Sequence, residues 1–375
     1  MSRRLNIQVI GAGGMGSALA YLIGEVGHSV EVIDQNPAIY ESWAKTRRNN
    51  LYPYLEEFEF PETVSFRPSE NCDSFTTGGY DFTILAVPGN CLIDLLGRLN
   101  IARDGGPLVL LQKSAIYTAS GLLTPSEVVQ YHYRNHRKRP RGRAARQWKP
   151  AVITLTGAAF AWNLINRVHS GMILAAHVED EESAECFKKS VLVPIGSIWP
   201  YCTREVEAVG VLNALRTIAS CEQGLLDGFL RDRAWESAKA MASVAINQER
   251  VGLARFLLHH QAGRERDCDV FEPRSRVYRV LEADMVMCRD ISSRNYHLGF
   301  QLGSGIERSD ANEARLGTVE CVQNVDALAR TVSVCVCSDN WNKNYPYLNG
   351  LWRIFSGVAT VQEVADEIMA RIPRA

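Results

Sequence analysis

Residues 5–16 read LNIQVIGAGGMG, and this stretch decides the fold of the N-terminal half of the chain. Its first six residues are a short apolar run with β-branched side chains, which is typical of a buried strand. Three glycines follow at the spacing GxGxxG, and the next residues, SALAYLI, form the apolar face of a starting helix. A strand, a glycine-rich turn and a helix in this order predict a loop that holds a phosphate group on the helix N-terminus.

The glycines have separate physical tasks. Gly11 allows the tight turn out of the strand, Gly13 lets the backbone approach a pyrophosphate, and Gly16 lets helix and strand pack closely. The helix N-terminus adds unpaired N–H groups and the positive end of the helix dipole. We therefore expect cofactor contacts from the whole loop, which comprises Gly11, Gly13, Gly14, Met15 and Gly16.

An acidic residue completes the pattern. A second predicted strand, residues 29–33 (SVEVI), ends on Asp34, which lies 18 residues after Gly16. A carboxylate there accepts hydrogen bonds from the adenosine ribose and repels a 2′-phosphate. The sequence therefore predicts a Rossmann dinucleotide site that prefers NAD to NADP, although Lys45, Arg47 and Arg48 are cations close by in the sequence. The alternative, a glycine-rich turn without a ligand, would not need the acid at that place.

Composition narrows the class of protein. The chain has 375 residues with 41 basic and 42 acidic side chains, so no overall charge favours nucleic acid or a membrane surface as a partner. No apolar run approaches the length of a membrane span, and the N-terminal residues enter the first strand directly. The ten cysteines show no zinc-ligand spacing, so we expect reduced thiols and no metal. These features predict a cytoplasmic protein.

Hydrophobic periodicity changes along the chain. Up to about residue 200, short apolar runs alternate with helical segments, which predicts a doubly wound, mostly parallel sheet. Beyond about residue 204, long stretches with a period of 3.6 residues dominate and predict a helical domain. We expect an α/β Rossmann domain over residues 1–202 and an all-α substrate and catalytic domain over residues 203–375. The further expected strands are residues 80–87, 107–111, 151–156 and 171–175, and the expected helices include 206–228, 234–260 and 361–372.

Two polar segments interrupt these domains. Residues 131–149 are strongly basic, and they fit a solvated surface insertion better than a site for an acidic partner, because Pro140 and Gly142 break the segment. Residues 263–275 form a polar loop in the helical half, long enough to be a lid.

The order of motifs resembles the NAD(P)-dependent glycerol-3-phosphate dehydrogenases over nearly the whole chain. No single motif is specific, but their common order and spacing make chance similarity improbable. The motifs are VIGAGGMGSALA, RRNNLYPYLEEFEFPETV, ILAVPGN, LLQKSAIYTASGLLTPSEV, TLTGAAFAWNL, VGVLNALRTIAS, ADMVMCRDISSRNYHLG and TVECVQN.

The resemblance implies a role for each matching polar residue. Lys113 would lie beside the substrate and the nicotinamide, and Asp284 would orient the catalytic lysine. Arg294 and Asn295 would bind the substrate phosphate, for which a guanidinium fork is well suited. The other implied residues are Gly157 for the substrate and Pro88, Arg294 and Glu320 for the cofactor. The alternatives are a surface lysine, an ordinary arginine at a helix start and a helix-capping aspartate.

The chain departs from the family pattern at two places. The family has its proton-transferring lysine in an A-L-K-N run, whereas residues 214–217 here read ALRT. Arg216 stays protonated, so it cannot be a conventional general base, although it can hold an anion or polarise a carbonyl. Where the family has S-G-P-S, residues 156–159 read TGAA, which removes a hydroxyl from the substrate loop.

These residues favour an enzyme. We expect a nicotinamide-dependent dehydrogenase or ketone reductase acting on a small anionic substrate, such as glycerol 3-phosphate, dihydroxyacetone phosphate or a close relative. Lys113, Arg216 and Asp284 are the expected catalytic residues. The alternatives are a cofactor-binding homologue without dehydrogenase activity, acting as a sensor or scaffold, and an imine reductase on the same scaffold. The family also suggests a homodimer.

Overall fold

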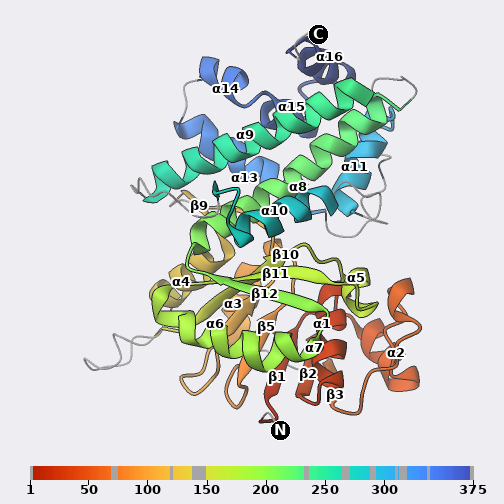
Figure 1. Cartoon of the computed structure of the whole chain (residues 1–375), viewed down its shortest axis with the longest axis vertical. Helices are drawn as coiled ribbons and strands as arrows, with labels where there is room; N and C mark the ends of the chain where they lie inside the picture. Colours follow the sequence, from red (N-terminus) through yellow and green to blue (C-terminus); the bar gives the residue numbers. More distant parts are fainter. Residues whose placement is uncertain are drawn as a thin grey trace. The chain divides into compact units, whose positions relative to one another are not determined.

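The chain forms two compact units (Figure 1). The first comprises Met1–Gln112 and Pro125–Val206, and the second comprises Lys113–Thr124 and Glu207–Ala375. The computed structural model describes residues 3–68, 75–118, 121–136, 149–231, 236–262, 271–287, 293–308, 311, 319–335 and 338–371. Most of the basic segment, residues 137–148, and most of the polar loop, residues 263–270, lie outside the described residues.

The first unit is built on an eight-stranded sheet in the order β12-β11-β10-β7-β5-β1-β2-β3. Neighbouring strands are parallel except β10 and β11, which pair antiparallel. The predicted mostly parallel sheet is therefore confirmed. The strands are β1 (Asn6–Ile10), β2 (Ser29–Asp34), β3 (Val64–Pro68), β5 (Phe82–Leu85), β7 (Leu108–Leu110), β10 (Val152–Gly157), β11 (Ser170–Ala176) and β12 (Ile198–Thr203), with a separate parallel pair β4 (Phe75–Thr76) and β6 (Leu99–Asn100).

Helices complete the core of this unit. Leu19, Leu22 and Ile23 of α1 are fully buried, as are Ile7 and Val9 of the central strand β1. The helices are α1 (Gly14–Glu25), α2 (Pro37–Thr46), α3 (Leu92–Arg98), α4 (Pro125–His136), α5 (Ala161–Ile165), α6 (Glu181–Phe187) and α7 (Val193–Ile195), with single turns at Pro53–Leu55, Gly89–Cys91, Val178–Asp180 and Lys188–Leu192. Continuous apolar strands such as β7 are buried, as a sheet covered on both faces requires.

The second unit is helical, as the 3.6-residue period predicts, but it also contains a hairpin. The helices are α8 (Val206–Phe229), α9 (Glu236–Ala262), α10 (Arg276–Met287), α11 (Arg294–Gly303), α13 (Glu320–Cys335), α14 (Ser338–Asn344), α15 (Pro346–Phe355) and α16 (Val361–Arg371). The antiparallel hairpin of β8 (Ile116–Thr118) and β9 (Gly121–Leu123) packs against α13. The expected cut after residue 202 does not anticipate that residues 113–124 group with the helices.

Four glycines allow α8 and α11 to approach with their backbones in contact. A Cβ added at Gly224 or Gly228 would overlap a carbonyl oxygen of α11, and one added at Gly299 or Gly303 would overlap a carbonyl oxygen of α8. Both pairs have a spacing of four residues, so each lies on one face of its helix. Figure 1 shows the two helices side by side. This contact sets where α11 begins relative to α8.

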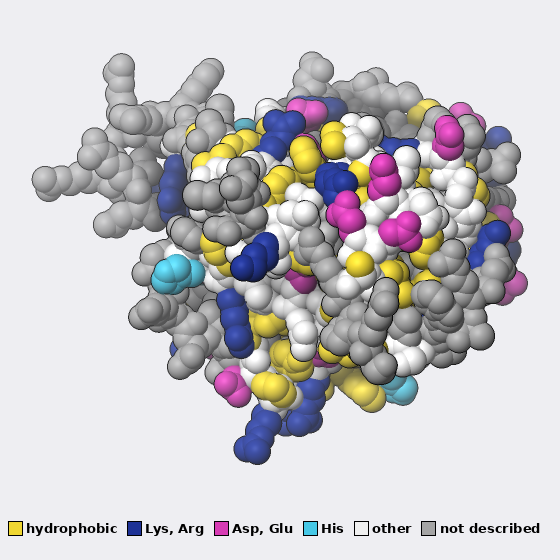
Figure 2. Space-filling model, turned by 90° about the horizontal axis from the view of Figure 1, so that it is seen from above, with side chains coloured by type: hydrophobic (Ala, Val, Ile, Leu, Met, Phe, Trp, Pro, Cys, Tyr) yellow, Lys and Arg dark blue, Asp and Glu magenta, His cyan; other side chains and the backbone are white. Residues whose placement is uncertain are grey.

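The surface carries mixed charge. Figure 2 shows one face of the molecule, on which Lys and Arg side chains and Asp and Glu side chains both occur among apolar and uncharged groups. The described helices also lack the features of a membrane span, since none of them is both long and apolar enough to cross a membrane.

We expect Gly299→Ala to destabilise the protein by about 1–3 kcal/mol, because the new methyl group has no room against α8. The matched control is Gly252→Ala on α9, where an added Cβ meets no atom within 4 Å. The free energy of unfolding of that variant should rise by about 0.5–1 kcal/mol, because alanine has a higher helix propensity than glycine. Urea denaturation followed by far-UV circular dichroism measures both, and equal effects of the two variants would contradict the close contact.

Candidate active site

The glycine loop is required by backbone packing. Gly11 has φ of +106°, and an added Cβ would lie 2.8 Å from the carbonyl carbon of Ala86, just after β5. A Cβ at Gly16 would overlap the carbonyl oxygen of Gly11, and one at Gly14 would overlap the hydroxyl of Tyr54. A side chain at any of these positions would therefore displace α1, β5 or Tyr54.

The start of α1 fits the phosphates of a dinucleotide. Its N-cap, Gly13, makes no side-chain capping bond, and the first turn of the helix contains no acidic residue. The first N–H groups of Gly14, Met15 and Gly16 therefore meet neither a capping side chain nor a competing carboxylate of the helix. The dipole of a 12-residue helix adds to these N–H groups, an arrangement that favours a bound anion.

Asn49 braces the loop from a distant part of the chain. It is fully buried, and its Nδ2 donates to Ala12 O at 3.1 Å and to Ser17 Oγ at 3.0 Å. Ser17 Oγ itself donates to Ala12 O at 2.9 Å. The sequence reasoning did not assign a role to Asn49, although the residue lies within the motif RRNNLYPY.

Asp34 is tied to the same loop. Its Oδ2 accepts a hydrogen bond from Ala12 N at 2.6 Å, and its Oδ1 accepts one from Asn36 N at 2.8 Å. A carboxylate has about four acceptor positions, so lone pairs are left for ribose hydroxyls. These bonds hold the negative charge of Asp34 at the loop, where it would repel a 2′-phosphate.

The nearby arginines are engaged elsewhere. Arg47 donates from Nε to Phe60 O at 3.1 Å and from Nη2 to Pro61 O at 2.6 Å. Arg48 donates to Glu56 O at 3.1 Å. These contacts hold both guanidinium groups on main-chain oxygens of residues 56–61.

Pro88 lies in the turn after β5, and Gln112 holds this turn. The Nε2 of Gln112 donates to Leu85 O at 3.0 Å and to Val87 O at 3.1 Å, and the residue is buried. Because Gly11 packs against Ala86, the turn and the glycine loop are fixed together. Sequence reasoning missed Gln112, whose only signal is its place directly before Lys113.

Gly157 ends β10 with φ of +138°. An added Cβ would overlap Gly171 O and would lie 2.8 Å from the Cα of Met172, both on the paired strand β11. The glycine is thus required by the antiparallel pairing, independently of the substrate contact that the family resemblance implies. Ala158 and Ala159, which replace the proline and the second serine of the family pattern, are buried.

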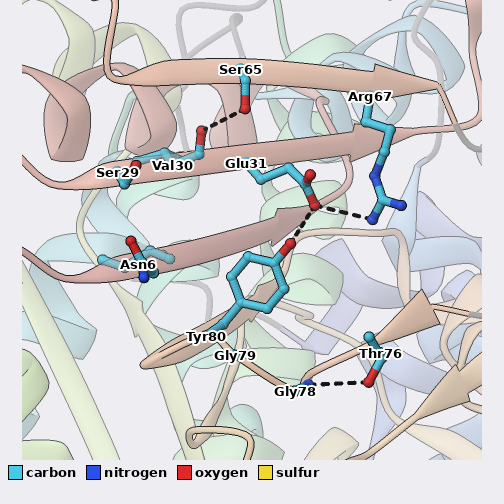
Figure 3. Close-up of a pocket in the computed structure, with 11 residues that line it drawn as sticks. Asn6, Ser29, Val30, Glu31, Ser65, Arg67, Thr76, Gly78, Gly79 and Tyr80 are labelled. Atoms are coloured by element: carbon cyan, nitrogen blue, oxygen red, sulfur yellow. Dashed lines mark hydrogen bonds and ion pairs between the residues drawn. The ribbon is translucent and has the colours of Figure 1, made fainter.

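A polar groove of about 470 Å³ occupies a different place in the first unit (Figure 3). It lies near the amino ends of β1 and β2, whereas the glycine loop follows the carboxyl end of β1. There Glu31 accepts hydrogen bonds from Tyr80 Oη at 2.6 Å and from Arg67 Nη2 at 3.0 Å. Burial, together with the bond to Glu31, raises the pKa of Tyr80 to about 12. The groove is therefore separate from the dinucleotide loop.

In the second unit, Arg216 on α8 and Asp284 on α10 form an ion pair. Arg216 is 1% exposed and Asp284 is 2% exposed, so both charges are withdrawn from water. An isolated buried charge would cost several kcal/mol, and each of these groups therefore stabilises the ionised form of the other. Arg216 replaces the lysine of the family pattern, so Asp284 still has a cationic partner.

Arg294 and Asn295 begin α11. Asn295 Oδ1 accepts a hydrogen bond from Cys321 N at 3.0 Å, in the first turn of α13, directly after Glu320. Arg294 is exposed, and its guanidinium has no hydrogen-bond or ion-pair partner among the residues that the structure describes. A cation at the positive end of a helix with no acid in the first turn is unfavourable by itself, and a bound anion would offset both charges.

Lys113 is half-buried and lies in a segment without regular secondary structure. Its carbonyl oxygen accepts a hydrogen bond from Nδ2 of Asn324 on α13 at 2.9 Å. The second unit therefore links the Lys113 segment to the helix that begins with Glu320. Sequence reasoning quoted the motif TVECVQN but gave no role to its last residue.

The N-terminal part of the chain matches a model of a known protein family. Residues 6–182 match the model of the NAD-dependent glycerol-3-phosphate dehydrogenase N-terminus. Over these residues the chain is similar to that family. The chain is 24% identical over 373 residues to a glycerol-3-phosphate dehydrogenase [NAD(P)+] of Halorhodospira halophila, covering 98% of each chain. It is 23% identical to the one of Hydrogenovibrio crunogenus, covering 99% of this chain and 96% of the relative.

Solved structures show the same fold. The glycerol-3-phosphate dehydrogenase of Coxiella burnetii matches with a TM-score of 0.72 at 18% sequence identity, covering 98% of this chain and 99% of that one. The Rossmann and helical domains predicted from sequence are therefore confirmed as fold classes.

We expect the protein to bind NADH more tightly than NADPH, since the Asp34 carboxylate would face the 2′-phosphate. Asp34→Asn should reduce this preference by about tenfold or more, because like charges brought together are strongly unfavourable. The control is Glu31→Gln, which removes a carboxylate from the same strand at the separate groove and should leave both affinities unchanged. Titration by nucleotide fluorescence gives the dissociation constants, and tighter binding of NADPH to the unaltered protein would contradict the prediction.

Proposed function

We propose that the protein is a nicotinamide-dependent oxidoreductase of CH–OH groups that interconverts a small phosphorylated alcohol and its ketone. The substrate pair is glycerol 3-phosphate and dihydroxyacetone phosphate or a close relative. The observation that carries the proposal is the glycine loop with Asp34 bound to Ala12, in a chain that aligns with such dehydrogenases over almost its full length. This proposal includes NAD as the preferred cofactor, a cytoplasmic location and a homodimer.

The first unit supplies the cofactor residues. Gly11 to Gly16 and the start of α1 would hold the pyrophosphate, Asp34 the adenosine ribose, and the Pro88 turn would border the dinucleotide. Bound there, the nicotinamide supplies the hydride acceptor or donor that oxidation or reduction of the substrate carbon requires.

The second unit supplies the charges for an anionic substrate. Arg294 is exposed at the start of α11, whose N-cap makes no side-chain capping bond, and Asn295 is fixed beside it by its bond to Cys321. A phosphate has the charge and the acceptor oxygens to match both. We assign these residues to the substrate phosphate, and Glu320 to the nicotinamide side.

Proton transfer at this site cannot use Arg216 as a base. The guanidinium is fully protonated, and the buried Asp284 stabilises that form. Arg216 would instead stabilise negative charge that develops on a substrate oxygen, while Lys113 or a water supplies the proton. Reduction of a ketone uses these groups more directly than oxidation of an alcohol.

The same ion pair favours the second candidate function. If Arg216 and Asp284 only neutralise each other, the chain is a cofactor-binding homologue without dehydrogenase activity. The two candidates differ in whether purified protein transfers hydride from NADH to dihydroxyacetone phosphate.

We expect Arg294→Ala to weaken substrate binding by about 10- to 150-fold, the usual loss for a charge-assisted hydrogen bond, with NADH binding changed only a few-fold. Arg279→Ala, an exposed arginine on α10, is the control and should leave both unchanged. Isothermal titration with dihydroxyacetone phosphate and with NADH measures the two affinities. Equal loss of both would mean that Arg294 maintains the structure or contacts the dinucleotide.

We expect Arg216→Lys to lower the rate of dihydroxyacetone phosphate reduction, because a lysine ammonium replaces a guanidinium that is matched to Asp284. Arg250→Lys is the matched control, since Arg250 is also buried and ion-paired, with Glu282 on α10. Steady-state rates in both directions measure the effect. A large gain of glycerol 3-phosphate oxidation in Arg216→Lys would identify a silenced dehydrogenase whose base had been lost.

A further inference from the structure

The side chain of Asn324 lies at the centre of a hydrogen-bond network in the second unit. It is 0% exposed, on the second turn of α13. Its Nδ2 donates to Lys113 O at 2.9 Å and to Thr217 Oγ1 at 2.8 Å, and it lies 3.4 Å from Ala214 O. Its Oδ1 accepts from Ala115 N at 2.8 Å. One amide therefore bonds the backbone on both sides of Ser114 and also reaches α8.

The network fixes the orientation of this amide. Ala115 N is a donor, so it must face the amide oxygen, whereas Lys113 O is an acceptor and must face the amide nitrogen. Thr217 Oγ1 donates its own proton to Ala214 O at 2.7 Å, which leaves its oxygen as an acceptor for Nδ2. Flipping the amide would place donor against donor and acceptor against acceptor in a buried site.

The position of Lys113 depends on these bonds, because the segment before β8 has no ladder or helix of its own. Thr217 follows Arg216 directly on α8, and Glu320 lies one helical turn before Asn324 on α13. The amide thus joins the backbone of Lys113 to the helix of Arg216 and to the helix that Glu320 begins.

We propose that Asn324 is a positioning residue that sets Lys113 relative to Arg216. The role of Lys113 in proton supply rests on the proposed function, whereas the placement of its side chain does not. Misplacing a group at a reacting centre by about 1 Å can cost on the order of 100-fold in rate. Asn324 has no part in the chemistry itself, because its polar atoms are bonded to the protein.

Two variants separate this role from simple structural support. Asn324→Leu removes every one of these hydrogen bonds and keeps the branching of the side chain. Asn324→Asp keeps an acceptor for Ala115 N but loses the donors as long as it is ionised. When its carboxyl is protonated, the O–H can again donate to Lys113 O or Thr217 Oγ1. Burial favours the protonated form.

We expect Asn324→Leu to lower kcat for dihydroxyacetone phosphate reduction by about 10- to 100-fold, with KM and the Kd of NADH changed less than about threefold. Asn324→Asp should be similarly impaired at high pH and should recover part of the loss as pH falls, relative to the unaltered enzyme. Asn247→Leu, which removes the amide that accepts from Arg250 on α9, is the control and should show neither effect. Unchanged kcat in Asn324→Leu, or no pH-dependent recovery in Asn324→Asp, would overturn the proposal.

A second readout does not need activity. Reductive methylation with ¹³C-labelled formaldehyde gives an NMR signal for each lysine, and Lys113→Arg identifies that of Lys113. In Asn324→Leu this signal should change in chemical shift and pH titration while the signals of Lys239 and Lys343 stay constant. If the unaltered protein proves inactive, the proposed function fails, but an unchanged Lys113 signal alone overturns the positioning role. A change in all lysine signals would indicate general unfolding and would also count against it.

Discussion

The close approach of backbone to backbone at Gly11 is the constraint on which the cofactor half of the molecule depends. The chain leaves β1 at a φ that only glycine adopts easily, and it passes so near to the end of β5 that a single Cβ would force them apart. Because α1 begins in this contact, its uncapped N-terminus is held where the strand ends. Asp34 and Asn49 then bond to Ala12, and Gln112 bonds to the turn after β5. These backbone positions present the main-chain N–H groups at the start of α1.

The helical unit contains charged groups that are buried away from water. Arg216 and Asp284 compensate each other in the interior, so removing either partner leaves a buried charge without its counter-ion. Arg294, by contrast, stays exposed at the positive end of α11. One arginine is therefore paired in the interior, whereas the other has no ion-pair partner among the residues that the structure describes. Arg216 lies on α8 and Arg294 on α11. These two helices approach so closely at their glycines that the backbone oxygens of one leave no room for a side chain on the other.

Much of the fold could be predicted from the sequence because its signals are local. The GxGxxG spacing, the acid at the end of the second strand and the change from strand alternation to helical periodicity each lie within a few tens of residues. The expected strand over residues 151–156 corresponds to β10, and the expected helix over residues 206–228 corresponds to α8. Strands β3 and β12 were not predicted, because β3 ends on Pro68 and β12 contains Pro200, and proline is unfavourable in a strand.

What the sequence by itself determined is the class of each domain, the glycine loop with Asp34, and the identity of the charged residues that match the family. Only the tertiary structure decided that residues 113–124 belong to the helical unit, that Arg216 is paired with Asp284, and which amides hold the site together. Asn324 meets Lys113 and Ala115 across 211 and 209 positions of the chain, and Asn49 meets Ala12 across 37. A buried amide must satisfy its donors and acceptors with whichever groups the fold brings near, and partners so distant leave no periodic trace in the sequence.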